Sequence, residues 1–158
     1  MRHIYNLLIE LVHETYRKLI WLSLKYCDKF QFVLPHHINH NSSVQEVIKK
    51  FAKFQLSNDE VSEWPGTKLL KGTATLYRYN LNKDSASQLI DSNKSLYSWA
   101  QPDFPEDLCL IRADNTSWLA SISYEKDGYF ELTKNEIREI QELIPELIIS
   151  KYKVDRVD

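Results

Sequence analysis

Carboxylate side chains are most densely placed at Asp103, Glu106 and Asp107, just before a strongly apolar segment. Carboxylates held close together raise one another's pKa, and such a pair can serve as acid and base in catalysis. Asp103 lies between Pro102 and Pro105 and Glu106 directly follows Pro105, in a proline-bounded loop where full hydration is the ordinary state of a carboxylate. Both interpretations of this cluster stay open from the sequence.

Two further charged residues, Arg112 and Glu125, follow the cluster along the chain. If both faced one cleft with Asp103 and Glu106, the four side chains would form the polar site of a small hydrolase or transferase. A cross-strand ion pair explains Arg112 and Glu125 equally well. Enzymatic activity is therefore left open, and no catalytic residue is assigned.

Aromatic residues on or beside the expected strands give a different kind of candidate site. Tyr and Trp supply a large contact area for a small loss of conformational entropy, so they are common in binding surfaces. If Tyr77, Tyr79 and Trp99 face solvent, the sheet has a binding platform. Some of these aromatic side chains must instead belong to the core.

Three of the 5 histidines, His36, His37 and His40, lie in one short loop. Imidazole is a common ligand for zinc, copper and nickel. A zinc site, however, normally collects its ligands from separate elements, so an ordinary polar loop is the preferred interpretation. We expect no metal and no cofactor, and we expect Cys27 and Cys109 to be reduced and buried.

The 158 residues include only 3 glycines, and they contain neither a phosphate-binding loop nor a Gly-x-Ser-x-Gly turn. The net charge of −2 is unevenly spread, because residues 1–100 carry +4 and residues 101–158 carry −6. Any charge-steered partner of the last third should be basic. The acidic total argues against nucleic-acid binding. Charged residues interrupt the apolar start of the chain, so we expect a cytoplasmic protein without a membrane span.

The expected elements combine into one α+β domain over residues 1–158, with a largely antiparallel sheet. Three strands should form a C-terminal meander, and Thr133 with Glu136 should cap the helix that follows. The meander strands are expected at Leu108–Arg112, Ser117–Tyr124 and Tyr129–Leu132.

Helical spacing of apolar residues predicts a long first helix from about Ile4 to Lys25. Ser43 and Glu46 predict a second capped helix, and Ser57–Glu60 resembles the cap of a further helical turn. Two more strands are expected at Phe30–Leu34 and Gly72–Leu81, and the chain should fray over Tyr152–Asp158.

Three segments resemble those of small soluble proteins of spore-forming bacteria, some of which are labelled stage III sporulation proteins. The segments are Lys25–Phe30, Glu60–Leu69, and Pro105 through Leu119. The resemblance implies no catalytic residues. The arrangement is also similar in style to immunity proteins that neutralise toxins through an acidic face. The preferred function is therefore a non-enzymatic module that binds a basic protein partner, with the small hydrolase or transferase as the alternative.

Overall fold

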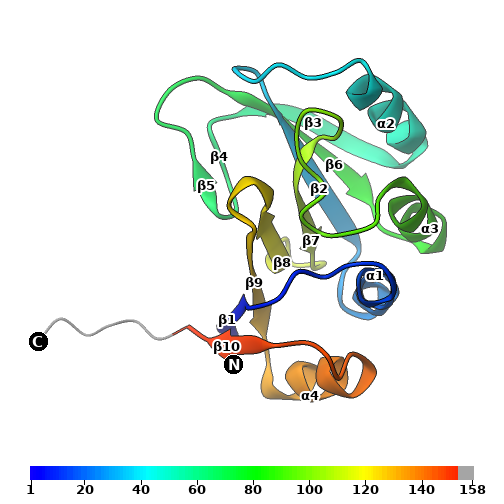
Figure 1. Cartoon of the computed structure of the whole chain (residues 1–158), viewed down its shortest axis with the longest axis vertical. Helices are drawn as coiled ribbons and strands as arrows, with labels where there is room; N and C mark the ends of the chain where they lie inside the picture. Colours follow the sequence, from blue (N-terminus) through cyan, green and yellow to red (C-terminus); the bar gives the residue numbers. More distant parts are fainter. Residues whose placement is uncertain (153–158) are drawn as a thin grey trace, which may run out of the picture.

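The structure, a computed structural model, describes residues 1–152 and consists of one large antiparallel sheet with helices packed on it (Figure 1). The expected α+β class with a largely antiparallel sheet is confirmed. The expected fraying after Tyr152 lies outside the described residues. Within them, no helix is both long enough and apolar enough to cross a membrane.

The main sheet has eight strands in the order β10-β1-β9-β8-β7-β2-β6-β3, and β4 and β5 form a separate hairpin. The strands are β1 (His3–Leu7), β2 (Lys29–Pro35), β3 (Gln55–Val61), β4 (Glu63–Trp64), β5 (Thr67–Lys68), β6 (Ala74–Asn80), β7 (Glu106–Ile111), β8 (Ser117–Ile122), β9 (Asp127–Leu132) and β10 (Ile149–Lys151). The helices are α1 (Glu14–Tyr26), α2 (Ser43–Phe51), α3 (Lys83–Ser92) and α4 (Lys134–Leu143), with short 3-10 turns at η1 (Ala52–Phe54) and η2 (Ser123–Glu125).

The four helices lie on one face of the sheet and bury the main core against it (Figure 1). Phe32 and Tyr79 of neighbouring strands meet Phe51 of α2 and Trp99 of the loop before β7, all of them fully buried. The indole Nε1–H of Trp99 also donates to the Tyr16 hydroxyl of α1 across 3.0 Å. Aromatic packing and this hydrogen bond thus join α1, α2 and the loop before β7 to the central strands.

The opposite face of the sheet is partly covered by the β4–β5 hairpin (Figure 1). Trp64 packs there on Val33, Ala74 and Leu76, which alternate with helix-facing residues along β2 and β6. This second, smaller apolar cluster fixes the hairpin against the sheet. The two faces of β2 are therefore both covered, which agrees with its nearly continuous apolar sequence.

The prediction of a long first helix is wrong in its first half. His3–Leu7 is strand β1, which pairs with β9 and β10, and α1 begins only at Glu14 after His13, whose φ is 50°. The apolar residues of this segment fit helical spacing, but pairing on both edges satisfies its backbone groups across the sheet. Long-range pairing overrides local pattern here.

Two local predictions also need correction. Ser57–Glu60 does not begin a helical turn, because it belongs to β3, which pairs with β6 along its length. The cap expected from Ser43 and Glu46 is absent: Ser43 is already the first helical residue of α2, and no side chain caps that helix. By contrast, the Thr133–Glu136 capping box of α4 is confirmed.

Candidate binding pocket

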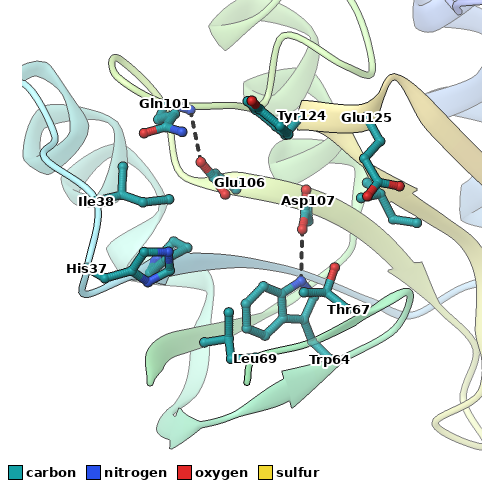
Figure 2. Close-up of a pocket in the computed structure, with 12 residues that line it drawn as sticks. His37, Ile38, Trp64, Thr67, Leu69, Gln101, Glu106, Asp107, Tyr124 and Glu125 are labelled. Atoms are coloured by element: carbon teal, nitrogen blue, oxygen red, sulfur yellow. Dashed lines mark hydrogen bonds between the residues drawn. The ribbon is translucent and has the colours of Figure 1, made fainter. Parts of the chain in front are cut away.

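A pocket of about 390 Å³ opens between the β4–β5 hairpin and the start of β7 (Figure 2). It lies on the sheet face opposite the helices, and its walls come from five separate segments of the chain. The lining residues are Pro35, His37, Ile38, Trp64, Thr67, Leu69, Gln101, Glu106, Asp107, Ile122, Tyr124 and Glu125.

A β-bulge at the start of β7 turns two consecutive carboxylates into this pocket. Gln31 pairs with Cys109 and Val33 pairs with Glu106, so β7 contains one residue more than β2 over the same length. Asp107 has a φ of 60°, in the left-handed region. Successive side chains of a regular strand point to opposite faces, but the bulge lets Glu106 and Asp107 line the same pocket. Backbone strain of this kind often occurs at functional sites.

The β4–β5 hairpin supplies the partner of Asp107. The indole Nε1–H of Trp64 donates to Asp107 Oδ2 across 2.8 Å, while the Ser123 amide donates to Oδ1 across 2.9 Å. Gly66, in the turn after Trp64, has a φ of 89°, and a Cβ there would lie 2.7 Å from Ile122 Cγ1. Only glycine fits both this positive φ and this close contact. The glycine thus allows the Trp-Pro-Gly-Thr turn to place Trp64 beside Asp107.

Glu106 is less well satisfied than Asp107. It is 7% exposed, and its Oε1 accepts only a long hydrogen bond of 3.4 Å from the Gln101 amide. Among the described residues, no hydrogen bond or ion pair reaches Glu106 Oε2. Burial, with the neighbouring charge of Asp107 added, raises the pKa of Glu106 above its usual value. Burial also raises the pKa of Asp107, despite the lowering effect of its two hydrogen bonds.

The pocket is acidic and partly aromatic. Its lining in the described chain contains three carboxylates, of Glu106, Asp107 and Glu125, and no Lys or Arg. His37, an exposed residue, supplies an imidazole at the rim. Tyr124 is 83% exposed at the same opening, whereas Trp64 is buried in the wall. Such a lining favours a positively charged ligand over an anion.

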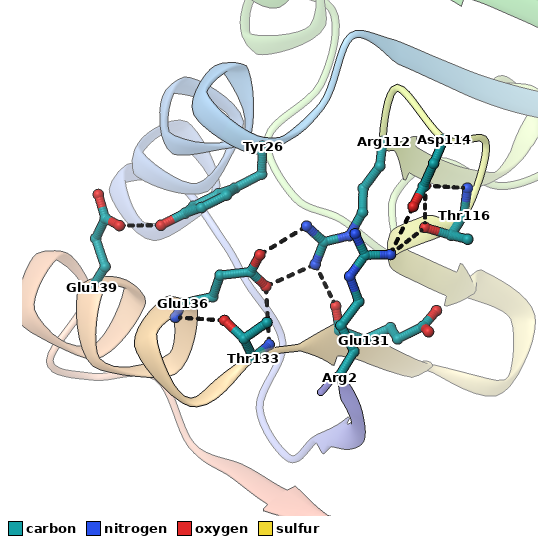
Figure 3. Close-up of polar contacts among 9 residues, drawn as sticks. All are labelled: Arg2, Tyr26, Arg112, Asp114, Thr116, Glu131, Thr133, Glu136 and Glu139. Carbon is teal, nitrogen blue, oxygen red and sulfur yellow. Dashed lines mark hydrogen bonds and ion pairs between the residues drawn. The ribbon is translucent and has the colours of Figure 1, made fainter.

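Much of the other negative charge in the last third is already matched within the molecule (Figure 3). Arg112 donates two hydrogen bonds, of 2.8 and 2.7 Å, to the Glu136 carboxylate, and both side chains are buried. The remaining ion pairs of this kind are Arg2–Asp114, Lys25–Glu139 and Lys18–Glu146. The pocket carboxylates have no such ion pairs among the described residues. They therefore account for a larger share of the unneutralised negative charge than of the acidic residues in the last third.

The four members of the predicted polar site do not all meet. Glu106 and Glu125 share the pocket, but Asp103 accepts hydrogen bonds from Asn41 and Ser43 outside it. Arg112 follows the far end of β7, about 20 Å from Glu106 at 3.4 Å per residue. Arg112 instead binds Glu136 of α4, so it does not form the cross-strand pair with Glu125 that the sequence also allowed.

The proposed aromatic platform is not present on the described surface. Tyr79 and Trp99 are fully buried in the main core, and Tyr77 is half-buried beside them. Tyr77 and Tyr79 occupy positions of β6 that face the main core, and Trp99 packs into the same core from the loop before β7. Tyr124, in η2 directly after β8, is instead an exposed aromatic residue at the pocket.

The histidine loop is divided among different contacts. The His36 ring lies within hydrogen-bond distance of the Thr73 and Thr75 hydroxyls, and His40 Nε2 lies 3.2 Å from the Pro35 carbonyl oxygen. Within residues 1–152, no three His, Cys, Asp or Glu side chains are grouped closely enough to hold a metal ion. Cys27 and Cys109 are free and buried, and burial raises the pKa of the Cys109 thiol to about 12.

Three pocket residues were not among the predicted binding residues: Asp107 was considered only as part of the carboxylate cluster, His37 only as a possible metal ligand, and Trp64 was not predicted as a site residue. A usable signal existed in the hairpin register: antiparallel pairing of β7 with β8 places the start of one strand beside the end of the other. That pairing brings Glu106 and Glu125 together and separates both from Arg112. The Trp-Pro-Gly-Thr turn carried no comparable indication of which strand it would cover.

Comparisons of the chain with protein-family models, with curated proteins and with solved structures find no match. The functional argument therefore depends on the pocket itself.

Proposed function

We propose that this protein is a non-enzymatic binding module that holds a basic protein partner at the acidic pocket. The observation that carries the proposal is the lining, in which three carboxylates and exposed Tyr124 meet without a Lys or Arg among the described residues. A partner's cationic side chain would neutralise this charge, and Tyr124 at the rim would add contact area.

The energetics of Glu106 support a binding role. A carboxylate that is 7% exposed and holds one long hydrogen bond destabilises the free protein, because its charge is poorly solvated. A bound cation would remove that penalty. Functional sites often contain groups that lower the stability of the folded protein in this way.

Affinity capture from native lysate tests the proposal, with wild-type protein compared with the double variant Glu106→Gln, Glu125→Gln. Glu142→Gln is the matched control, since Glu142 is exposed on α4 and does not line the pocket. We expect a partner that the wild type and the control retain at low salt, and that high salt or the double variant releases. Recovery of the wild type alone at low salt contradicts the proposal.

A small hydrolase or transferase is the second candidate, favoured by the pairing of Glu106 with Asp107 in one pocket. Two neighbouring carboxyl groups whose pKa values are raised by burial are suited to proton transfer. Turnover of a small-molecule substrate panel that disappears in Glu106→Gln but not in Glu142→Gln would support this candidate. The absence of turnover by the wild type across ester, phosphoester and glycoside panels would count against it.

A further inference from the structure

We infer that the pocket recognises a guanidinium group, so that the partner inserts an arginine side chain rather than a lysine. This inference rests on the proposed function, because it names the chemical group by which the partner is held. It follows from the kind of acceptor, the shape of the walls and the spread of the negative charge.

The available acceptor is Glu106 Oε2, which no hydrogen bond reaches among the described residues and which remains accessible in the pocket, although Glu106 as a whole is only 7% exposed. Figure 2 shows Glu106 and Asp107 reaching the pocket from adjacent positions of β7. Asp107 already accepts one hydrogen bond at each oxygen. The pocket therefore offers several acceptor positions on neighbouring carboxylates, and a planar group with five N–H donors can reach more than one of them.

The walls are apolar and aromatic around these oxygens. Trp64 and Leu69 come from the hairpin, Ile38 from the loop after β2, and Ile122 and Tyr124 from the end of β8 and η2. A guanidinium is weakly hydrated and stacks on aromatic faces, so it loses less on entering such walls than a strongly hydrated ammonium. A volume of about 390 Å³ is ample for one arginine side chain.

A metal ion fits the site less well. The described chain contains no group of three His, Cys, Asp or Glu side chains close enough to ligate one ion. The carboxylates of Glu106, Asp107 and Glu125 are thus spread over a wider span, which suits an extended organic cation.

The test titrates ¹⁵N-labelled protein with Nα-acetyl-arginine amide, Nα-acetyl-lysine amide and the neutral Nα-acetyl-citrulline amide. The readout is the NMR signal of the Trp64 indole Nε1–H, because this group donates a hydrogen bond to Asp107 inside the pocket. The signal is assigned by its loss in the Trp64→Phe variant. We expect saturable binding of the arginine compound with a Kd on the order of 1 mM. Binding of the lysine compound should be roughly tenfold weaker, and the citrulline compound should cause no saturable shift.

Glu106→Gln should weaken binding of the arginine compound by about tenfold or more, while Glu142→Gln should leave it unchanged. If Glu106→Gln does not fold, as judged from the signals of buried Trp99 and Trp118, Glu125→Gln replaces it and should weaken binding in the same direction. Equal affinity for the lysine or citrulline compound, or no binding of the arginine compound, overturns the inference.

The outcomes separate this inference from the proposed function. Binding of the arginine compound without capture of any protein partner supports guanidinium recognition and contradicts the protein-binding role. Capture of a partner that depends on Glu106, combined with a preference for the lysine compound, supports the binding role and overturns guanidinium recognition.

Discussion

Trp64 and Asp107 are joined by a buried hydrogen bond of 2.8 Å between the indole Nε1–H and Oδ2, across 43 positions of sequence. This contact ties the β4–β5 hairpin to the bulge of β7 and so holds two walls of the pocket together. The hydrogen bond also satisfies a carboxylate that is 5% exposed. The position and the charge of Asp107 therefore depend on a hairpin that is not part of the main sheet.

Trp64→Phe should lower the free energy of unfolding by about 1–3 kcal/mol, because a buried carboxylate loses a donor while the ring volume is largely kept. Chemical denaturation in urea at neutral pH measures this loss. Trp21→Phe is the control, since Trp21 is 38% exposed on α1 and should change stability by less than about 0.5 kcal/mol. Equal effects of the two substitutions would contradict the assigned role of the Trp64 hydrogen bond.

Gly66→Ala should destabilise the protein more than Gly72→Ala. Both glycines have a φ near 85–89°, so each alanine adopts a left-handed conformation that costs about 1–2 kcal/mol. Only at Gly66 would the new Cβ also meet Ile122, at 2.7 Å, whereas nothing lies within 4 Å of the Cβ at Gly72. The difference between the urea midpoints of the two variants measures the effect of the contact with Ile122. A larger loss of stability in Gly72→Ala would contradict the importance of that contact.

Glu106→Gln should stabilise the protein at neutral pH, on the order of 1 kcal/mol, because a poorly solvated buried charge is removed. The folded-state pKa of Glu106 lies above the unfolded value, so the native state binds the proton more strongly. The contribution of Glu106 protonation to the stability of the folded protein is complete below the pKa of the unfolded state. It disappears as pH rises through the pKa of the folded state.

Urea denaturation at pH 4 to 8 should therefore show the stability advantage of Glu106→Gln growing as pH increases. The exposed-site control Glu142→Gln should run parallel to the wild type. A Glu106→Gln variant that is less stable than the wild type at pH 8 would show that the carboxylate is well satisfied in the free protein.

Glu136→Gln should cost about 3–5 kcal/mol at neutral pH, since it leaves the Arg112 guanidinium buried without its counter-charge (Figure 3). Burial alone would raise the pKa of Glu136, but the hydrogen bonds from Arg112 and from the Thr133 amide outweigh it and lower the pKa. The stabilising contribution is thus present above the unfolded pKa and is lost as pH falls through the folded pKa.

Denaturation curves recorded from pH 7 down to pH 3 should show the wild type and Glu136→Gln converging at the acid end. Glu142→Gln again serves as the matched substitution on α4. If the gap between wild type and Glu136→Gln stays constant as pH falls, the ion pair is not the source of the difference.

Local chemistry alone determined several features of this chain. The Thr133–Glu136 capping box is set by residues three positions apart, and the Trp-Pro-Gly-Thr turn is set by a glycine whose φ is positive. Helix caps and turns depend on neighbours along the chain, so their signals survive in the sequence. The short apolar segments also predicted a largely antiparallel sheet, although not all of its strands.

Tertiary structure decided the rest. His3–Leu7 became a strand because β9 and β10 lie on either side of it, although its apolar spacing also fits a helix. Arg112 faces Glu136 instead of Glu125. The antiparallel pairing of β7 with β8 places Arg112, after the end of β7, beside the start of β8, whereas Glu125 follows the end of β8. The bulge at Asp107, which directs Glu106 and Asp107 into one pocket, depends on how β7 meets β2. Contacts between segments far apart in the sequence leave no local pattern, so only the folded chain brings these groups together.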